Sequence, residues 1–253
     1  MAENQIIMHH LWPVIQLQCV DSTNNYASLL LSGNEANTET VVSAQCQGKG
    51  RGQQGNYWES EKGKNLTFSL ILHTDYLDIE KQFSLSQAIA LAIVDFLNDY
   101  NIIANIKWPN DILVGNKKIA GILIENSIMG HTIVNSIVGI GINVNQVVFE
   151  NYKPKAVSLK MISKEEYDTH STLNQLLDKV KIRVDELKKK EYYILKQEYL
   201  QNLYGYEEVG KYWADGKEFS GIIKDVRQTG ELVILAEDDI ELSFMFKEVK
   251  FII

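Results

Sequence analysis

The sequence contains very few cysteines, with only Cys19 and Cys46 among 253 residues. These two are too far apart for a C-x-x-C redox or zinc motif, which excludes a site of that kind. Both lie in apolar, strand-like segments, where a free cysteine behaves as a small hydrophobic residue. The sequence therefore predicts two reduced, buried thiols.

Long hydrophobic runs are also missing. No apolar run approaches the roughly 20 residues that cross a bilayer. The first ten residues are polar and lack the basic start and apolar core of a signal peptide. These absences exclude a membrane or secreted class and predict a cytoplasmic protein. His9 and His10 are adjacent, which is not the spacing of a metal site, so we expect a solvated pair.

Basic residues are in the minority, with 25 Lys and Arg against 33 Asp and Glu and a net charge of −8. A general nucleic-acid-binding protein needs a basic face, so this balance argues against that class. What is present is 45% hydrophobic content, which supports a sizeable core. The length allows one large domain or a main domain with a small one. The composition fits a soluble enzyme.

A glycine-rich segment, residues 48–58, follows an apolar, strand-like run at 40–46. Gly50, Gly52 and Gly55 match the spacing of a dinucleotide fingerprint, but that fold needs a helix directly after the last glycine. Here residues 66–72 read as a second strand, so the pattern is strand, loop, strand. Such a loop can present backbone N–H groups to an anion, and Arg51 adds a permanent charge. A flexible surface loop is the alternative.

A hairpin is predicted over residues 106–125. Pro109 and the turn pair after it end one strand, and Gly115 with Asn116 forms a two-residue turn. The return strand is continuously apolar from 119 to 124, as in a strand buried on both faces. Lys118 beside Asp111 is a plausible active-site pair, and a solvated hairpin tip is the alternative reading.

The remaining pattern alternates strands and helices. We expect a strand at 14–20, a helix at 26–31 with an N-cap among residues 21–24 and a C-terminal glycine at Gly33, and a helix from a capping box at 84–87 to about residue 100. A strand at 133–144 carries Gly139 and Gly141 on one face, against which either a flat group or a helix packs. One long helix follows at 171–204, and five short strands after 209 predict a small barrel or sandwich.

Four segments occur in the order that is typical of biotin–protein ligases, and the chain resembles that family over nearly its whole length. They are Gly50-Arg51-Gly52-x-x-Gly55-x-x-Trp58, Lys107-Trp108-Pro109-Asn110-Asp111, Lys118-Ile119-Ala120-Gly121-Ile122-Leu123 and Gly139-x-Gly141-Ile142-Asn143. The resemblance implies an α+β fold, with a mixed, largely antiparallel sheet flanked by helices and a small C-terminal SH3-like β-barrel. The expected domains are residues 1–206 and 207–253.

The resemblance also implies a two-step reaction. Biotin and ATP, with Mg²⁺ held by the ATP rather than directly by the protein, would give biotinyl-5′-AMP and pyrophosphate. A lysine amine of a biotin carboxyl carrier domain would then displace AMP. Such a ligase would need no membrane. A homodimer is left open, because exposed sheet edges could pair between subunits.

Site residues follow by family position. Lys118 would contact the biotin carboxylate and the α-phosphate, Arg51 and the loop would close over the adenylate, and Asp111 would act either through Mg²⁺ or as the proton acceptor. The biotin contacts implied are Ser22, Thr23, Asn24, Gln47, Gly50, Arg51, Gly52, Lys118, Gly121, Gly139 and Gly141. The nucleotide contacts implied are Arg51, Gln53, Gln54, Gly55, Trp58, Asn110, Lys118, Ile142 and Asn143.

The chain departs from the family pattern in two places. Gln53, Gln54 and Asn56 stand where many relatives have arginine, so the loop is less basic. Only about a dozen residues precede the first expected strand, too few for the helix-turn-helix domain of some relatives, so we expect no specific DNA binding. The alternatives are a lipoate or octanoate ligase or transferase of the same fold, a non-catalytic biotin-binding regulator, and an adaptor that uses the barrel.

Overall fold

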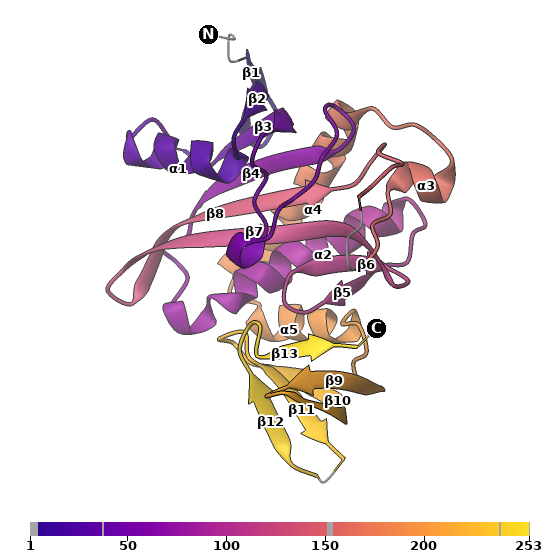
Figure 1. The fold of residues 1–253 in the computed structure, drawn as a ribbon. Coiled ribbons are helices and arrows are strands. Elements are labelled where there is room, and N and C mark those ends of the chain that lie inside the picture. The colour runs from indigo at the N-terminus through magenta and orange to yellow at the C-terminus, as the bar shows by residue number, and fades with distance from the viewer. Residues whose placement is uncertain (1–4, 37, 151–153, 238, 253) are drawn as a thin grey trace.

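The computed structural model describes residues 5–36, 38–150, 154–237 and 239–252, and these form two sheets with flanking helices (Figure 1). The larger sheet has eight strands in the order β1-β2-β3-β4-β8-β7-β6-β5. All neighbouring pairs are antiparallel except β2 with β3. The predicted α+β class with a mixed, largely antiparallel sheet is confirmed. The strands are β1 (Gln5–Met8), β2 (Pro13–Val20), β3 (Thr40–Gln47), β4 (Leu66–His73), β5 (Asn105–Lys107), β6 (Asp111–Val114), β7 (Lys117–Met129) and β8 (Thr132–Ile142).

Helices cover the two faces of this sheet unequally. Strand side chains alternate between faces, so Leu70 of β4 lies in the main core while its neighbour Ile71 lies in a smaller cluster under α1 (Thr23–Ser32). The main core packs against α2 (Phe83–Asp99), which is buried along most of its length, and against α4 (Thr169–Lys188) and α5 (Tyr192–Gln201). A short α3 (Leu159–Ser163) and two 3-10 turns, η1 (Gln53–Gly55) and η2 (Ile79–Lys81), complete the fold.

Three helix boundaries differ from the sequence prediction. The α2 helix begins at Phe83, one residue before the expected capping box, and no side chain caps it. The predicted long helix is two helices, because Lys190 adopts a left-handed backbone with φ 63° between α4 and α5. After α1 it is Asn34, with φ 54°, and not Gly33, that takes the left-handed conformation. The apolar face of α4 is buried and consists of Leu173, Leu176, Leu177, Val180, Val184 and Leu187.

The five predicted C-terminal strands form a second, antiparallel sheet in the order β12-β11-β10-β9-β13, which lies beside α5 (Figure 1). Trp108 fixes this sheet to the large one: its indole Nε1 donates to the Gly230 carbonyl at 2.9 Å, and its ring lies 5.3 Å from that of Phe246. Trp108 therefore has a structural role. The strands are β9 (Val209–Ala214), β10 (Lys217–Val226), β11 (Leu232–Ala236), β12 (Glu241–Phe244) and β13 (Val249–Phe251).

The cysteine prediction is wrong in both respects. Cys19 and Cys46 form a disulfide, Cys19 is exposed and Cys46 is half-buried. The cause is the register of the parallel pair β2 and β3, which sets the two residues directly opposite with their Cα atoms 4.7 Å apart. None of the helices that the structure describes is long and apolar enough to cross a membrane.

Candidate active site

A cavity of about 300 Å³ lies over the middle of the large sheet, between the N-terminus of α1 and the glycine-rich loop. Its floor is formed by β4, β8 and β7, in register so that Gly141 faces Gly121 and Gly139 faces Leu123. Glycines on adjacent strands lower the floor and let other groups lie directly on the backbone.

Two side chains already use this space. A Cβ atom on Gly141 would overlap the indole of Trp58, and one on Gly139 would overlap the amide of Asn24. The sequence left open whether a flat group or a helix packs on these glycines, and both occur: the Trp58 ring lies on Gly141, and Asn24 of α1 lies on Gly139. The indole Nε1 of Trp58 is buried and has no hydrogen-bond partner among the described residues. A ligand with an acceptor atom in the cavity would satisfy it.

One end of the cavity, here called the neutral end, consists of the uncharged polar residues Ser22, Thr23, Asn24, Gln47 and Ser69, and hydrogen bonds join all of them except Ser22. The Ser69 hydroxyl, fully buried, lies 2.8 Å from the Thr23 hydroxyl and 2.6 Å from the Asn24 side-chain oxygen. The Gln47 side-chain oxygen accepts from the Thr23 backbone N–H at 2.8 Å and so caps α1. The Ser22 side chain makes no capping bond, although it is 2% exposed, and it lines the cavity.

The other end, here called the charged end, contains Lys118 and Asp111. Their Nζ and Oδ1 atoms are 2.6 Å apart, and both side chains are mostly buried. A bulge at Ile119 of β7, opposite Ile112 and Leu113, shifts the register of the β6–β7 hairpin, in which Asp111 faces Gly121. The Lys118 ammonium also lies 5.4 Å from the centre of the Trp58 ring. The predicted lysine–aspartate pair is therefore part of a cavity wall and not a solvated tip.

Lys107 adds a third ionisable group behind this end. Burial lowers its pKa, the Lys118 charge lowers it further, and the Asp111 carboxylate opposes both effects. A desolvated lysine near two charged groups is a common feature of functional sites. Lys107 does not itself line the cavity.

Arg51 is paired rather than free. Its guanidinium contacts the Glu125 carboxylate, with Nη2 to Oε1 at 2.6 Å, and donates to the Asn25 side chain at 2.6 Å. Glu125 also accepts from the Asn24 amide at 2.8 Å, which ties the pair to the neutral end. Glu125 balances the Arg51 charge in this arrangement, so Arg51 adds no net positive charge to the cavity.

The glycine-rich loop is a small hairpin and not an open anion nest. Arg51 and Tyr57 form an isolated bridge, and η1 makes the tip, where Gly55 has φ 89°. The N–H groups of Gly52 and Trp58 bond to loop carbonyls at 2.7 and 2.9 Å. Those donors are already occupied, so the loop serves mainly as a wall that carries Arg51 and Trp58.

Most of the predicted site residues meet in this cavity. Gly50 and Gly55 lie in an adjoining shallow depression, Ile142 is fully buried in the core, and no side-chain position is described for Gln54. The Asn110 amide donates to the Ile122 carbonyl and the Asn143 amide to the Val157 carbonyl, so both hold the cavity wall together. The predicted residues that line the cavity are Ser22, Thr23, Asn24, Gln47, Arg51, Gly52, Gln53, Trp58, Asn110, Asp111, Lys118, Gly121, Gly139, Gly141 and Asn143.

Sequence reasoning missed Ser69 and Glu125. A period-two signal existed for Glu125, which follows Gly121 and Leu123 on the same face of β7. Ser69 gave no local signal, because its role depends on the pairing of β4 with β8 opposite Gly139.

The family model described as "Biotin/lipoate A/B protein ligase family" matches residues 16–143, a range that contains both ends of the cavity. This chain belongs to that family.

Known proteins resemble the chain to different extents. The solved biotin protein ligase from Aquifex aeolicus, in complex with biotin and ATP, is 28% identical with a TM-score of 0.77, covering 94% of this chain and 97% of that one. The bifunctional ligase/repressor BirA of Bacillus spizizenii is 35% identical over 164 residues, 63% of this chain and 50% of that protein. A biotin--[acetyl-CoA-carboxylase] ligase of Mycobacterium tuberculosis is 24% identical over 228 residues, 88% and 84% respectively. The chain spans about half the length of the BirA relatives that it matches.

Proposed function

We propose that this chain is an ATP-dependent ligase that activates biotin as biotinyl-5′-AMP and transfers the biotinyl group to a lysine of a biotin carboxyl carrier domain. The observation that carries this proposal is one cavity with a buried neutral network at one end and Lys118 with Asp111 at the other. Similarity over nearly the whole chain to a ligase solved with biotin and ATP supports it.

The neutral end fits the ureido ring of biotin. That ring carries two N–H donors and a carbonyl acceptor and no charge, so it needs neutral partners inside an enclosed site. The hydroxyls of Ser22 and Thr23 and the amides of Asn24 and Gln47 supply donors and acceptors there. The network fixes their positions before the ligand arrives, which lowers the entropy that binding must overcome.

The charged end fits the adenylation step. A biotin carboxylate oxygen attacks the α-phosphorus of ATP, and the bond to pyrophosphate breaks. Both reactants are anionic, so a fixed cation between them stabilises the developing charge. Lys118 has three N–H donors and uses one toward Asp111, which leaves donors for the carboxylate and the phosphate. Arg51 would join this contact only after leaving Glu125.

In the second step an uncharged lysine amine of the carrier domain attacks the biotinyl carbonyl, the bond from that carbonyl to the AMP phosphate breaks, and the proton lost by the new amide passes to water. Asp111 has its role in the first step, where its carboxylate holds the Lys118 ammonium in position. The glycine-rich loop and Trp58 would shield the anhydride from water before the carrier arrives.

We place Mg²⁺ with the ATP phosphates rather than in a protein cage. Asp111 and Glu59 are carboxylates of the cavity lining, and Mg²⁺ is commonly bound by one or two carboxylates together with substrate phosphates. When bound, the ion would neutralise charge on the phosphates and orient them. Asp111 would face the ion without holding it directly, and the oxygens of Glu59 already accept from the Gln146 amide and the Glu150 N–H.

Lipoate or octanoate transfer is the nearest alternative. Neither acyl chain carries a donor or acceptor that could bond to the neutral end, so either would cover Ser22, Thr23, Asn24 and Gln47 without forming hydrogen bonds to them. This network favours biotin. A non-catalytic biotin-binding regulator would not need Lys118 and Asp111 at 2.6 Å.

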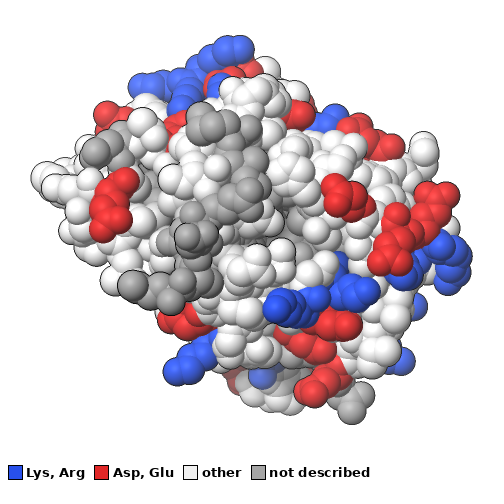
Figure 2. Space-filling view, turned by 90° about the horizontal axis from the view of Figure 1, so that it is seen from above, with Lys and Arg blue, Asp and Glu red and all other residues white. Residues whose placement is uncertain are grey.

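We further propose that residues 1–206 carry catalysis, that residues 207–253 support them through Trp108, and that the chain does not bind specific DNA. The net charge of −8 supports the last point. Basic and acidic side chains are interspersed on the face shown in Figure 2, without a basic patch across it. A homodimer through the β1 or β5 edge stays a prediction that sedimentation can check.

The decisive experiment combines the protein, biotin, ATP, Mg²⁺ and a biotin carrier domain, and measures the carrier's mass. We expect an increase of one biotinyl group, no increase with lipoate, and loss of the reaction in Lys118→Ala. Biotin-dependent exchange of pyrophosphate into ATP without transfer would point to a different acceptor. Binding of biotin without any exchange would refute the ligase proposal.

A further inference from the structure

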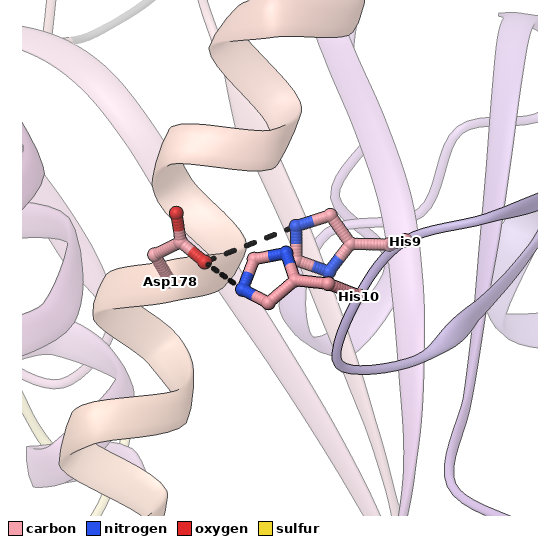
Figure 3. A group of neighbouring side chains, drawn as sticks. All are labelled: His9, His10 and Asp178. Atoms are coloured by element: carbon pink, nitrogen blue, oxygen red, sulfur yellow. Dashed lines mark ion pairs between the residues drawn. The ribbon is translucent and has the colours of Figure 1, made fainter.

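A group of metal-binding side chains lies away from the ligase cavity, at the turn between β1 and β2. His9 and His10 point toward Asp178 on α4, and both rings approach the same carboxylate oxygen (Figure 3). The distances from Asp178 Oδ1 are 3.8 Å to His9 Nε2 and 3.2 Å to His10 Nε2. One candidate ligand atom from each residue lies within 4.8 Å of the others. None of these residues lines the cavity.

His9 is the unusual member of this group. Its side chain is not solvated as the sequence predicted, because only 8% of the residue is exposed. Its Nε2 atom is buried and has no hydrogen-bond partner among the described residues, since 3.8 Å to Asp178 is too long for a hydrogen bond. A buried polar atom without a partner needs an explanation, and an ion is one of the usual ones.

We propose that His9, His10 and Asp178 bind a divalent transition-metal ion of the Zn²⁺ type, with water in the fourth coordination position. Imidazole and carboxylate are normal zinc ligands at 2.0–2.2 Å, which sets ligand atoms roughly 3.3–3.6 Å apart in a tetrahedron. The observed 3.2 and 3.8 Å lie just below and just above this range, so shifts of a few tenths of an ångström would bring the atoms to it. Soft thiolate ligands are absent from the group, so the set favours Zn²⁺ and its neighbours over Cu(I).

His170 comes from the same face of α4. Positions 170, 174 and 178 are spaced by four residues, and the Nε2 of His170 lies 3.5 Å from the Asn174 amide. His170 is not a member of the group of ligand atoms, so it lies beside the site on α4.

One contact changes when the ion binds. The Leu11 backbone N–H donates to His9 Nδ1 at 3.3 Å, which puts the ring proton on Nε2. A metal at Nε2 takes that place and the proton moves to Nδ1, so the long Leu11 contact opens. The bound ion would link the edge strand β1, through its turn, to α4, which is a structural role and not a catalytic one.

The test uses the full chain after treatment with a chelator, titrated with Co²⁺ and then with Zn²⁺. We expect one Co²⁺ per chain with the intense visible absorption of a tetrahedral site, displaced by Zn²⁺. We also expect the melting temperature to rise by roughly 5 °C when free Zn²⁺ is a hundred times the dissociation constant.

His10→Ala and Asp178→Asn change side chains that are 65% and 48% exposed, so folding should survive. Both should lose the Co²⁺ spectrum and the thermal shift, and His131→Ala, an exposed histidine outside the group, should keep them. Equal Co²⁺ spectra in all four proteins, or no bound metal in the unmodified chain, would overturn the proposal. Ligase activity is not a readout here, so the two proposals fail independently.

Discussion

The two ends of the cavity solve different problems with different chemistry. At the neutral end four of the five residues are buried and Gln47 is half-buried, none of them carries a charge, and Ser69 is bonded to both Thr23 and Asn24. The charged end is more open, with Lys118 27% and Asp111 17% exposed, and its polarity comes from one ion pair. The two ends lie two residues apart along β8. Asn24 of the neutral end packs on Gly139, and Trp58, next to Lys118 of the charged end, packs on Gly141. A neutral ligand group would therefore be recognised by several fixed polar side chains, whereas negative charge would be stabilised by a single lysine.

The comparison predicts that substitutions at the two ends affect different constants. Lys118→Met keeps the length of the side chain and removes its charge. We expect biotinyl-5′-AMP formation to fall by about 10²–10³-fold, because one donor at the developing charge is lost. Pyrophosphate exchange measures this rate, and calorimetry should show a smaller loss of biotin affinity, because only the contact to the biotin carboxylate is removed. A parallel loss of biotin affinity would mean that the ends are not separate.

Reduction of the disulfide should loosen the neutral end and spare the charged end. Cys46 immediately precedes Gln47, and the bond closes a loop of 27 residues. Loop-closure entropy of that length corresponds to about 3.5 kcal/mol of unfolding free energy. Urea unfolding with and without dithiothreitol measures the difference, and Cys19→Ser with Cys46→Ser should be insensitive to the reductant. A count of two free thiols in the untreated protein would contradict the pairing.

Ser69→Ala should weaken biotin binding by about tenfold, because one buried hydrogen-bonding group that holds Thr23 and Asn24 is removed. The KM for ATP should not change. Thr67→Val, on the same face of β4 but bonded to the Ala44 carbonyl, is the matched control. A larger change in the KM for ATP than in biotin affinity would show that Ser69 acts on the charged end and not on the neutral end.

Glu125→Gln should have the smallest effect. The Arg51–Glu125 pair is more than one third exposed on both sides, so its direct contribution is under about 1 kcal/mol. We expect less than a fivefold change in the KM for biotin and none in its transfer to the carrier. A strong increase in the KM for ATP instead would show that Arg51 must be held by a full carboxylate for the adenylate step.

Much of this site could be predicted from local sequence. The β6–β7 turn at Gly115, the apolar return strand and the paired glycines of β8 each leave a short-range signal. Contacts between residues that are far apart in the chain leave no such local signal. The Cys19–Cys46 bond depends on the register of two parallel strands, Ser69 on a neighbour in β8, and the break at Lys190 on a backbone angle that no propensity specifies. Burial of His9 depends on α4, which lies far along the chain.

Covalent topology adds a consequence of the disulfide. The bond between Cys19 and Cys46 makes the intervening chain a closed ring, and all of α1 lies within it, including Ser22, Thr23 and Asn24. Three of the five residues of the neutral end therefore belong to one covalent cycle. The Cys19 and Cys46 ends of β2 and β3 cannot separate while it is intact, so the ring ties residues 22–24 to Gln47 even in the unfolded chain.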